Sequence, residues 1–339
     1  MRFLIVTPLV PPEPGGPSYY SVSLQEAFKK AGHEADLIAF KEVRQWPTGV
    51  RHLMFLYKVL LRALKADTLI ILDTVSVALP AVLAGWVLGK KTIIRTGGDF
   101  VWEHYVERTG EKIKLSEFYK AGKRSASLSS KENVLVWIQK YVVFKLADAL
   151  VFSTTWQRGI WREPYGLHES KMYVIENAYN IPLEKAVRDS VVPMFVWVGR
   201  RRVLKNTELL QVAFREFQKK CPKYSLECLS GVERNIVQDA LKNAYALVLP
   251  SVSEVSPNIV AEAIALGVPV LATDDCGLRG RFGGAVLWVD MVDLDQFERK
   301  LLSLTDVIFY KNQVQQIMSY HNMRSYDKLA GEFILMCTQ

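Results

Sequence analysis

The feature that most limits the fold of this chain is a regular alternation of short apolar segments with longer segments of helical spacing. Buried strands are expected at residues 3–7, 35–40, 68–72, 92–95, 149–153 and 172–175, and again at 195–198, 225–229, 246–249, 268–272 and 285–289. Helical spacing fills many of the intervals, at residues 19–31, 53–64, 78–88, 133–146, 208–219, 235–243 and 294–303. Such alternation implies parallel sheets covered by helices on both faces, so the sequence predicts an α/β fold.

The alternation is interrupted once, at residues 180–193, which have the pattern of a linker. We therefore expect two Rossmann-like domains facing each other across a cleft, at residues 1–180 and 193–320. A last helix within residues 321–339 is expected to cross back to the first domain. A ligand is expected in the cleft, at the carboxyl ends of the strands.

The composition indicates a folded globular protein with a basic net charge. Of the 339 residues, 50% are hydrophobic and 23% are charged, which is the profile of a folded globular chain. The net charge of +8 favours acidic ligands or an anionic membrane surface. We expect no nucleic-acid partner, because the sequence has no zinc finger, RNP-type aromatic motif or basic repeat.

The cysteines indicate a reducing compartment. Cys221, Cys228, Cys276 and Cys337 show neither a CxxC pair nor a Cys/His metal spacing. The opening sequence MRFLIVTPLVPPE has a short apolar run followed by prolines, unlike a signal peptide. We therefore expect a cytoplasmic protein without a bound metal, with the inner face of the membrane as a site of peripheral contact.

One apolar stretch, residues 69–89, has about the length of a membrane span. Asp73 and Pro80 interrupt it, and it divides into a β-rich half and an Ala/Leu-rich helical half. A buried strand followed by a packed helix is the better interpretation.

Residues 250–267, PSVSEVSPNIVAEAIALG, hold the most informative motif. Ser256 suits a helix N-cap and Pro257 the first helical position, and an apolar face at helical spacing follows. This places Glu254 in a loop and Glu262 on the helix, about a turn and a half from its start.

The backbone amides of Asn258 and Ile259 are expected at the positive end of this helix, which suits a phosphate. Two carboxylates beside a phosphate site fit a ligand with hydroxyl groups on both sides of its phosphates, such as a nucleotide-sugar. The alternative is an ordinary amphipathic helix with a glutamate in the preceding loop.

A basic cluster follows the strand at residues 195–198. Arg200 and Lys205 would neutralise a diphosphate, because arginine offers a planar donor fork and lysine a compact charge. The alternative is a solvated surface cluster, since Arg201 and Arg202 are also basic.

The first half of the chain has three further features of interest: a glycine pair, an aspartate after a strand and a basic helix. Gly15 and Gly16 lie before a helix and would let the backbone approach a ligand, although a plain turn explains them too. Asp99 follows a strand and would bind sugar hydroxyls or act near the reacting carbon, unless it only turns the loop. The helix at residues 53–65 has a basic amphipathic surface that fits either a membrane or ordinary packing against the core.

Four segments together resemble the family 4 retaining glycosyltransferases of the GT-B fold, over nearly the whole chain. They are PEPGGPSYYSVSLQEAFKKAGHEADLI, KMYVIENAYN, VGRRRVLKN and SEVSPNIVAEAIALGVPVLATD. The last is the most specific, since it resembles the family's E-x7-E element followed by a small-residue helix and a Gly-x-Pro-Val strand.

The resemblance implies a role for each residue of the E-x7-E element. Glu254 would contact the hydroxyls of the donor sugar and Glu262 those of the ribose. The backbone at Pro257, Asn258 and Ile259 would hold the diphosphate.

It also implies roles outside that element. Arg200 and Lys205 would neutralise the diphosphate, Gly15 and Gly16 would lie beneath the phosphates and the acceptor, and Asp99 would serve where the family often has a histidine. The reaction would be metal-independent and cofactor-free, moving a sugar from a nucleotide-sugar to a glycan, glycolipid or lipid-linked acceptor with retention.

One departure from the family keeps other functions open. Only SGVERNIVQDALKNAY separates two strands where many relatives place a further strand and helix that help to hold the base. A catalytically silent GT-B binding subunit and a nucleotide-sugar epimerase of the same fold are the alternatives.

Overall fold

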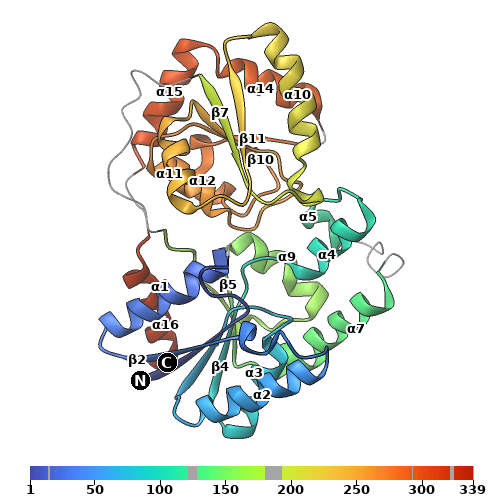
Figure 1. The fold of residues 1–339 in the computed structure, drawn as a ribbon, viewed down its shortest axis with the longest axis vertical. Coiled ribbons are helices and arrows are strands. Elements are labelled where there is room, and N and C mark those ends of the chain that lie inside the picture. The colour runs from blue at the N-terminus through green and yellow to red at the C-terminus, as the bar shows by residue number, and fades with distance from the viewer. Residues whose placement is uncertain (14–15, 121–127, 180–192, 292, 321–323, 339) are drawn as a thin grey trace. The chain divides into compact units, whose positions relative to one another are not determined.

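The computed structural model describes residues 1–13, 16–120, 128–179, 193–291, 293–320 and 324–338 (Figure 1). The chain divides into two compact units. Unit 1 comprises Met1–Trp102, Tyr119–Ala178 and Arg324–Gln339, and unit 2 comprises Glu103–Phe118 and Tyr179–Met323. Each is built on a parallel sheet, which confirms the predicted α/β class.

Unit 1 contains a six-stranded sheet in the order β2-β1-β3-β4-β5-β6. Its strands are β1 (Arg2–Thr7), β2 (Glu34–Ala39), β3 (Thr68–Ile71), β4 (Lys91–Arg95), β5 (Ala149–Phe152) and β6 (Met172–Val174). The central strands are buried on both faces, as their unbroken apolar runs predict.

Helices cover both faces of this sheet (Figure 1). They are α1 (Gly16–Lys30), α2 (Val50–Ala63), α3 (Ala78–Leu88), α7 (Ser130–Ile138), the π-helical turn η2 (Gln139–Val143), α8 (Phe144–Leu146), α9 (Thr155–Tyr165) and α16 (Tyr326–Thr338), with short 3-10 turns at η1 (Phe40–Val43) and η3 (Glu169–Lys171). Helix α4 (Phe100–Thr109) begins in unit 1, and its residues from Glu103 onward belong to unit 2. The C-terminal helix α16 packs on α1, where Phe28 contacts Phe333 in one apolar core. Right-handed crossovers place α2, α3 and α7–α8 over the opposite face.

Unit 2 contains a five-stranded sheet in the order β11-β10-β9-β7-β8. Its strands are β7 (Met194–Val198), β8 (Ser225–Leu229), β9 (Ala246–Leu249), β10 (Val270–Thr273) and β11 (Leu287–Val289). Its helices are α5 (Leu115–Phe118), α10 (Thr207–Lys220), α11 (Arg234–Asn243), α12 (Asn258–Ala265), α13 (Arg279–Phe282), α14 (Leu294–Ser303) and α15 (Val307–Met318), with 3-10 turns at η4 (Val203–Lys205) and η5 (Gly283–Ala285).

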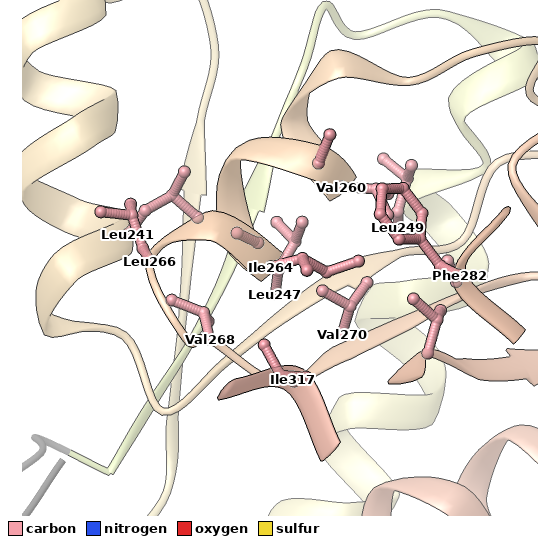
Figure 2. Close-up of a cluster of buried hydrophobic side chains, with 14 of the residues drawn as sticks. Leu241, Leu247, Leu249, Val260, Ile264, Leu266, Val268, Val270, Phe282 and Ile317 are labelled. Atoms are coloured by element: carbon pink, nitrogen blue, oxygen red, sulfur yellow. The ribbon is translucent and has the colours of Figure 1, made fainter. Parts of the chain in front are cut away.

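Two apolar cores lie on the two faces of the second sheet. Phe195 and Trp197 of β7 pack with α10 and α14, whereas Val196 between them packs with α11 and α12. This alternation follows from the period of two along a strand. Figure 2 shows Val260 and Ile264 of α12 against β9 and β10, so α12 is held to the sheet by its apolar side.

Three differences from the sequence expectation concern the first half. Helix α1 begins at Gly16, so this glycine is helical and not part of the preceding loop. Helices α4 and α9 were not anticipated. The segment Glu103–Phe118 groups with unit 2, although it lies within the predicted first domain. The predicted linker lies outside the described residues, except for Pro193.

Candidate functional site: the carboxyl edge of the second sheet

The candidate site of unit 2 lies where the strand order reverses. Strand β7 is hydrogen-bonded to both β8 and β9, so the chain leaves β7 toward one side and later returns to the other. At such a switch point the loops after the two central strands diverge and leave room for a ligand. These are the loops that contain Lys205 and Glu254.

The two loops are joined by a backbone hydrogen bond. The Val252 amide donates to the Leu204 carbonyl across 2.9 Å. This bond places Lys205 beside Glu254, and the two side chains form an ion pair. The sequence prediction that they share one site is therefore consistent with the geometry within unit 2.

Hydrogen bonds hold both the backbone amide and the backbone carbonyl of Glu254. Its amide donates to the Asp275 carbonyl at 3.0 Å, and its carbonyl accepts from the Gly277 amide at 2.9 Å. The carboxylate also accepts a hydrogen bond from Ser251 Oγ at 2.6 Å, and only 12% of the side chain is exposed. Its position is consequently fixed by the loops after β9 and β10.

Arg200 and Lys205 differ in their surroundings. Arg200 is exposed in the loop after β7, and no hydrogen bond or ion pair links it to another residue of the described ranges. Lys205 ends the 3-10 turn η4, and Asn206 after it has a φ of 50°. That left-handed residue turns the chain directly into α10, which holds Lys205 at the edge of the sheet.

Helix α12 begins at Asn258, one residue later than predicted, with Pro257 in place of Ser256 as N-cap. The shift is one residue, so Glu254 still precedes the helix and Glu262 still lies on it. Asn258 and Ile259 form the first turn, at the positive end of the helix.

Glu262 lies on the side of α12 away from the residues that contact the sheet. Its carboxylate accepts a hydrogen bond from Arg234 Nη2 at 3.0 Å, and 13% of its side chain is exposed. Burial raises the pKa of Glu262, and the nearby Arg234 charge offsets only part of that rise. The sequence analysis did not single out Arg234, since an arginine at a helix start has no motif of its own.

A segment from the first half of the chain supports the loop that contains Lys205. Glu107 of α4 accepts a hydrogen bond from the Leu204 amide at 3.1 Å, and it lies 3.4 Å from Arg202 Nε. Glu103 accepts from Arg202 Nη1 at 3.1 Å. Glu107 thus fixes the residue immediately before Lys205.

The same segment also contacts the loops after β9 and β10. The Leu115 amide donates to Ser253 Oγ at 2.8 Å, and Ser253 Oγ donates to Asp275 at 2.5 Å. Lys114 lies 3.2 Å from Asp274 and 2.9 Å from Asp290. Burial lowers the pKa of Lys114, but the hydrogen bonds to the two aspartates outweigh that effect and raise it.

Two predicted residues belong to unit 1 and are described there. Asp99 is 1% exposed, and its carboxylate accepts from the Trp102 amide at 2.9 Å, Tyr119 Oη at 2.5 Å and Trp161 Nε1 at 2.8 Å. Burial, reinforced by the Asp99 charge, raises the pKa of Tyr119 well above its usual value. These contacts favour the interpretation of Asp99 as a residue that shapes its loop, and its catalytic role stays a prediction.

The glycine pair is divided between described and undescribed residues. Gly16 is exposed at the start of α1, at the carboxyl end of β1. Gly15 lies outside the described residues.

Comparison with known proteins supports an assignment of the fold. The profile of the family described as Glycosyl transferases group 1 matches residues 185–306, which cover the loops of the candidate site. Sucrose-phosphate synthase from Thermosynechococcus elongatus matches 100% of this chain and 99% of its own at 14% identity, with a TM-score of 0.72. The resemblance to glycosyltransferases of the GT-B fold is confirmed.

Two further comparisons also give glycosyl-transferring enzymes. The catalytic domain of starch synthase IV from Arabidopsis thaliana, solved with ADP and acarbose, matches 99% of this chain and 98% of its own at 11% identity, with a TM-score of 0.66. An uncharacterized glycosyltransferase from Methanocaldococcus jannaschii is 27% identical over 175 residues. That match spans 42% of this chain and 43% of the relative's length.

Proposed function

We propose that this chain is a glycosyltransferase whose second unit holds a nucleotide-sugar donor. The observation that carries the proposal is the assembly of Lys205, Glu254 and the first turn of α12 at the carboxyl edge of one sheet, inside the region matched by the glycosyltransferase profile. A cation, a carboxylate and a helix N-terminus suit a diphosphate joined to a polyhydroxyl group.

The proposed roles follow from the chemistry of each group. Lys205 and Arg200 neutralise the diphosphate, with Arg200 exposed and able to turn toward a ligand. The amides of Asn258 and Ile259 and the N-cap Pro257 line the positive helix end beside it. A charged diphosphate is also the leaving group, so the same contacts lower the energy of the transition state as the bond to the sugar breaks.

The two glutamates would contact the two ends of the donor. We propose that Glu254 accepts hydrogen bonds from the sugar hydroxyls and Glu262 from the ribose. Both carboxylates now hold cations, Lys205 and Arg234, so a bound donor would share or replace these partners. Retention at the anomeric carbon and independence from a metal are parts of this proposal.

The acceptor belongs to unit 1 in this proposal. A glycan, glycolipid or lipid-linked hydroxyl would be bound near the start of α1 and the loop after β4, which contain Gly16 and Asp99. Gly15, which precedes α1 in the sequence, is proposed to contribute as well. We place the reaction in the cytoplasm, in keeping with the free cysteines Cys221, Cys228, Cys276 and Cys337.

The test replaces Glu254 with glutamine. Glu254→Gln removes the charge that competes with a diphosphate for Lys205, so calorimetry should show nucleoside diphosphate binding that is unchanged or a few-fold tighter. Sugar transfer from a labelled nucleotide-sugar should fall by roughly a hundredfold, since one lost polar contact to the transition state has effects of this size. The matched control is Glu216→Gln, on an exposed helix face.

Product analysis separates the alternatives. Label that moves to an acceptor supports a transferase, whereas an epimeric nucleotide-sugar formed without an acceptor supports an epimerase. Nucleotide binding with neither product would overturn the proposed activity and favour a silent GT-B binding subunit.

A further inference from the structure

Helix α2 presents an apolar line to solvent. Val50, Leu53, Tyr57, Leu61 and, just beyond the last helical residue, Leu64 follow one another at spacings of three or four and are between 44% and 69% exposed. This set is called the α2 stripe below. Spacing of this kind places all five side chains on one side of the helix.

The stripe is not the core-facing side of α2. Phe55, Val59 and Ala63 are fully buried on that side and attach the helix to unit 1. An ordinary surface helix has polar residues on its outer line. Here the outer line is apolar as well, and an exposed apolar patch of this kind marks an interaction surface.

Neighbouring helices expose further apolar residues. Helix α3 packs against both α2 and η2, and Figure 1 shows α2 and α3 together over the same sheet. Trp86 and Val87 at the end of α3 are exposed, as are Val134, Trp137 and Tyr141 on α7 and η2. We call α2, α3, α7 and η2 with these residues the helix layer.

The charges of the helix layer are mainly positive. The cations within its helices are Arg51, Lys58, Arg62, Lys131 and Lys140, and Lys65 and Lys90 follow the ends of α2 and α3 within two residues. The same helices contain a single acidic residue, Glu132, which is 1% exposed and forms a capping box with Ser129. Two of the cations, Lys58 and Arg62, have acidic partners on the neighbouring segment in Glu42 and Asp36. The outer surface of the layer is therefore cationic and apolar together.

We propose that the helix layer docks on an anionic lipid surface, with α2 lying in the plane of the headgroups. The leucines and valine would enter the boundary of the acyl chains, while arginine and lysine beside them meet lipid phosphates. Trp86, Trp137, Tyr57 and Tyr141 have the amphipathic rings that favour this depth. Within the described part of the chain no helix is long and apolar enough to cross a membrane, so the contact would be peripheral.

Charge favours lipid over a second copy of this chain. A symmetric dimer through the helix layer would bring two cationic surfaces together, and like charges in an interface oppose association. An anionic bilayer instead complements both the charge and the apolar stripe.

The test is sedimentation of the full chain with vesicles of phosphatidylcholine alone or mixed with phosphatidylglycerol. We expect binding to the anionic vesicles, weaker binding to neutral ones, and release by salt. The variant Leu53→Gln/Leu61→Gln should weaken binding by roughly tenfold for each leucine. Lys65→Gln/Lys131→Gln should weaken it by roughly fivefold for each lysine and reduce its sensitivity to salt.

The control variant is Val212→Gln/Ile236→Gln, two exposed apolar residues of unit 2, which should bind vesicles like the parent. Thermal melts would verify that each variant folds. The proposal is overturned if the parent ignores anionic vesicles, or if both leucine and control variants bind as it does. A lipid-free dimer that the leucine variant abolishes, with no vesicle binding, would instead assign the layer to self-association. Because the readout is binding, it does not depend on the proposed transferase activity.

Discussion

At the scale of residues, four charged side chains of the candidate site are paired with each other. Lys205 with Glu254 and Arg234 with Glu262 are two ion pairs on neighbouring loops and helices of unit 2. Partly buried pairs of this kind orient the carboxylates, at a cost in desolvation. A donor would gain preorganised groups and would pay little to order them.

Glu262 allows that desolvation cost to be measured. Its pKa in the folded protein lies above the ordinary value of 4.5, so folding favours the protonated carboxyl. The ionised group therefore lowers the free energy of unfolding at every pH above the folded pKa. Glu262→Gln should raise the Tm at pH 7 by about 1–3 °C, which corresponds to a change of the order of 1 kcal/mol or less.

The pH profile gives the control. The gain in Tm should shrink as the pH falls through the folded pKa of Glu262 and should vanish below about 4, where the carboxyl is protonated in both states. A stabilisation that grows toward low pH would contradict the assignment.

We expect that replacement of Asp99 lowers the stability of the protein. Asp99→Asn should lower the free energy of unfolding by about 2–3 kcal/mol, because it replaces an acceptor of charge-assisted hydrogen bonds from Tyr119 and Trp161 with a group that donates. The exposed Asp36→Asn in the same unit is the control. Full stability combined with a loss of transfer would instead favour the catalytic role.

At the scale of elements, unit 2 depends on the segment Glu103–Phe118. Its acidic residue Glu107 holds the backbone of Leu204, and its Leu115 and Lys114 hold the loops after β9 and β10. The three loops of the candidate site are thus fixed by an element that is distant in sequence.

Because Glu107 supports the loop that contains Lys205, its replacement should weaken ligand binding although Glu107 itself is not proposed to contact the ligand. Glu107→Ala should loosen the turn at Val203–Lys205 and weaken nucleoside diphosphate binding by roughly five- to tenfold, which corresponds to about 1–1.4 kcal/mol, the net contribution of one ordinary hydrogen bond. Hydrogen exchange of residues 203–206 should become faster. Glu117→Ala, an exposed residue on α5, should change neither quantity, and equal effects of both variants would refute the role of Glu107.

The sequence predicted elements best where a periodic apolar pattern decides the structure. The strands of both sheets and helix α12 follow from apolar runs and small-residue spacing. Helix α9 was missed because Gly159 and Pro164 interrupt its pattern, yet buried Trp161 and Tyr165 hold it in place. Tertiary packing here overrides local propensity.

Contacts between distant segments were beyond prediction for a related reason. The pairing of Arg234 with Glu262 and of Glu107 with Leu204 depends on which loops meet in space, and no local pattern encodes that. Lys205 and Glu254 could be placed together only because both follow strands whose carboxyl ends share an edge.

At the scale of the whole molecule, the chain consists of two units with separate cores. Unit 2 contains the paired charges proposed to hold the donor, and unit 1 contains the helix layer proposed to dock on lipid. Two units of this kind need not unfold together, so ligand effects belong to the unit that binds.

The proposed donor site of unit 2 can be tested by calorimetric titration of the parent with UDP, GDP and ADP, each beside its nucleoside. We predict that at least one diphosphate binds, that its nucleoside binds much more weakly, and that Arg200→Ala and Lys205→Ala each weaken the diphosphate by about 1.5–3 kcal/mol. Glu262→Ala should weaken the same ligand through the ribose. The assignment of a donor site to unit 2 would be contradicted if a diphosphate and its nucleoside bound equally well. It would also be contradicted if none of these ligands bound.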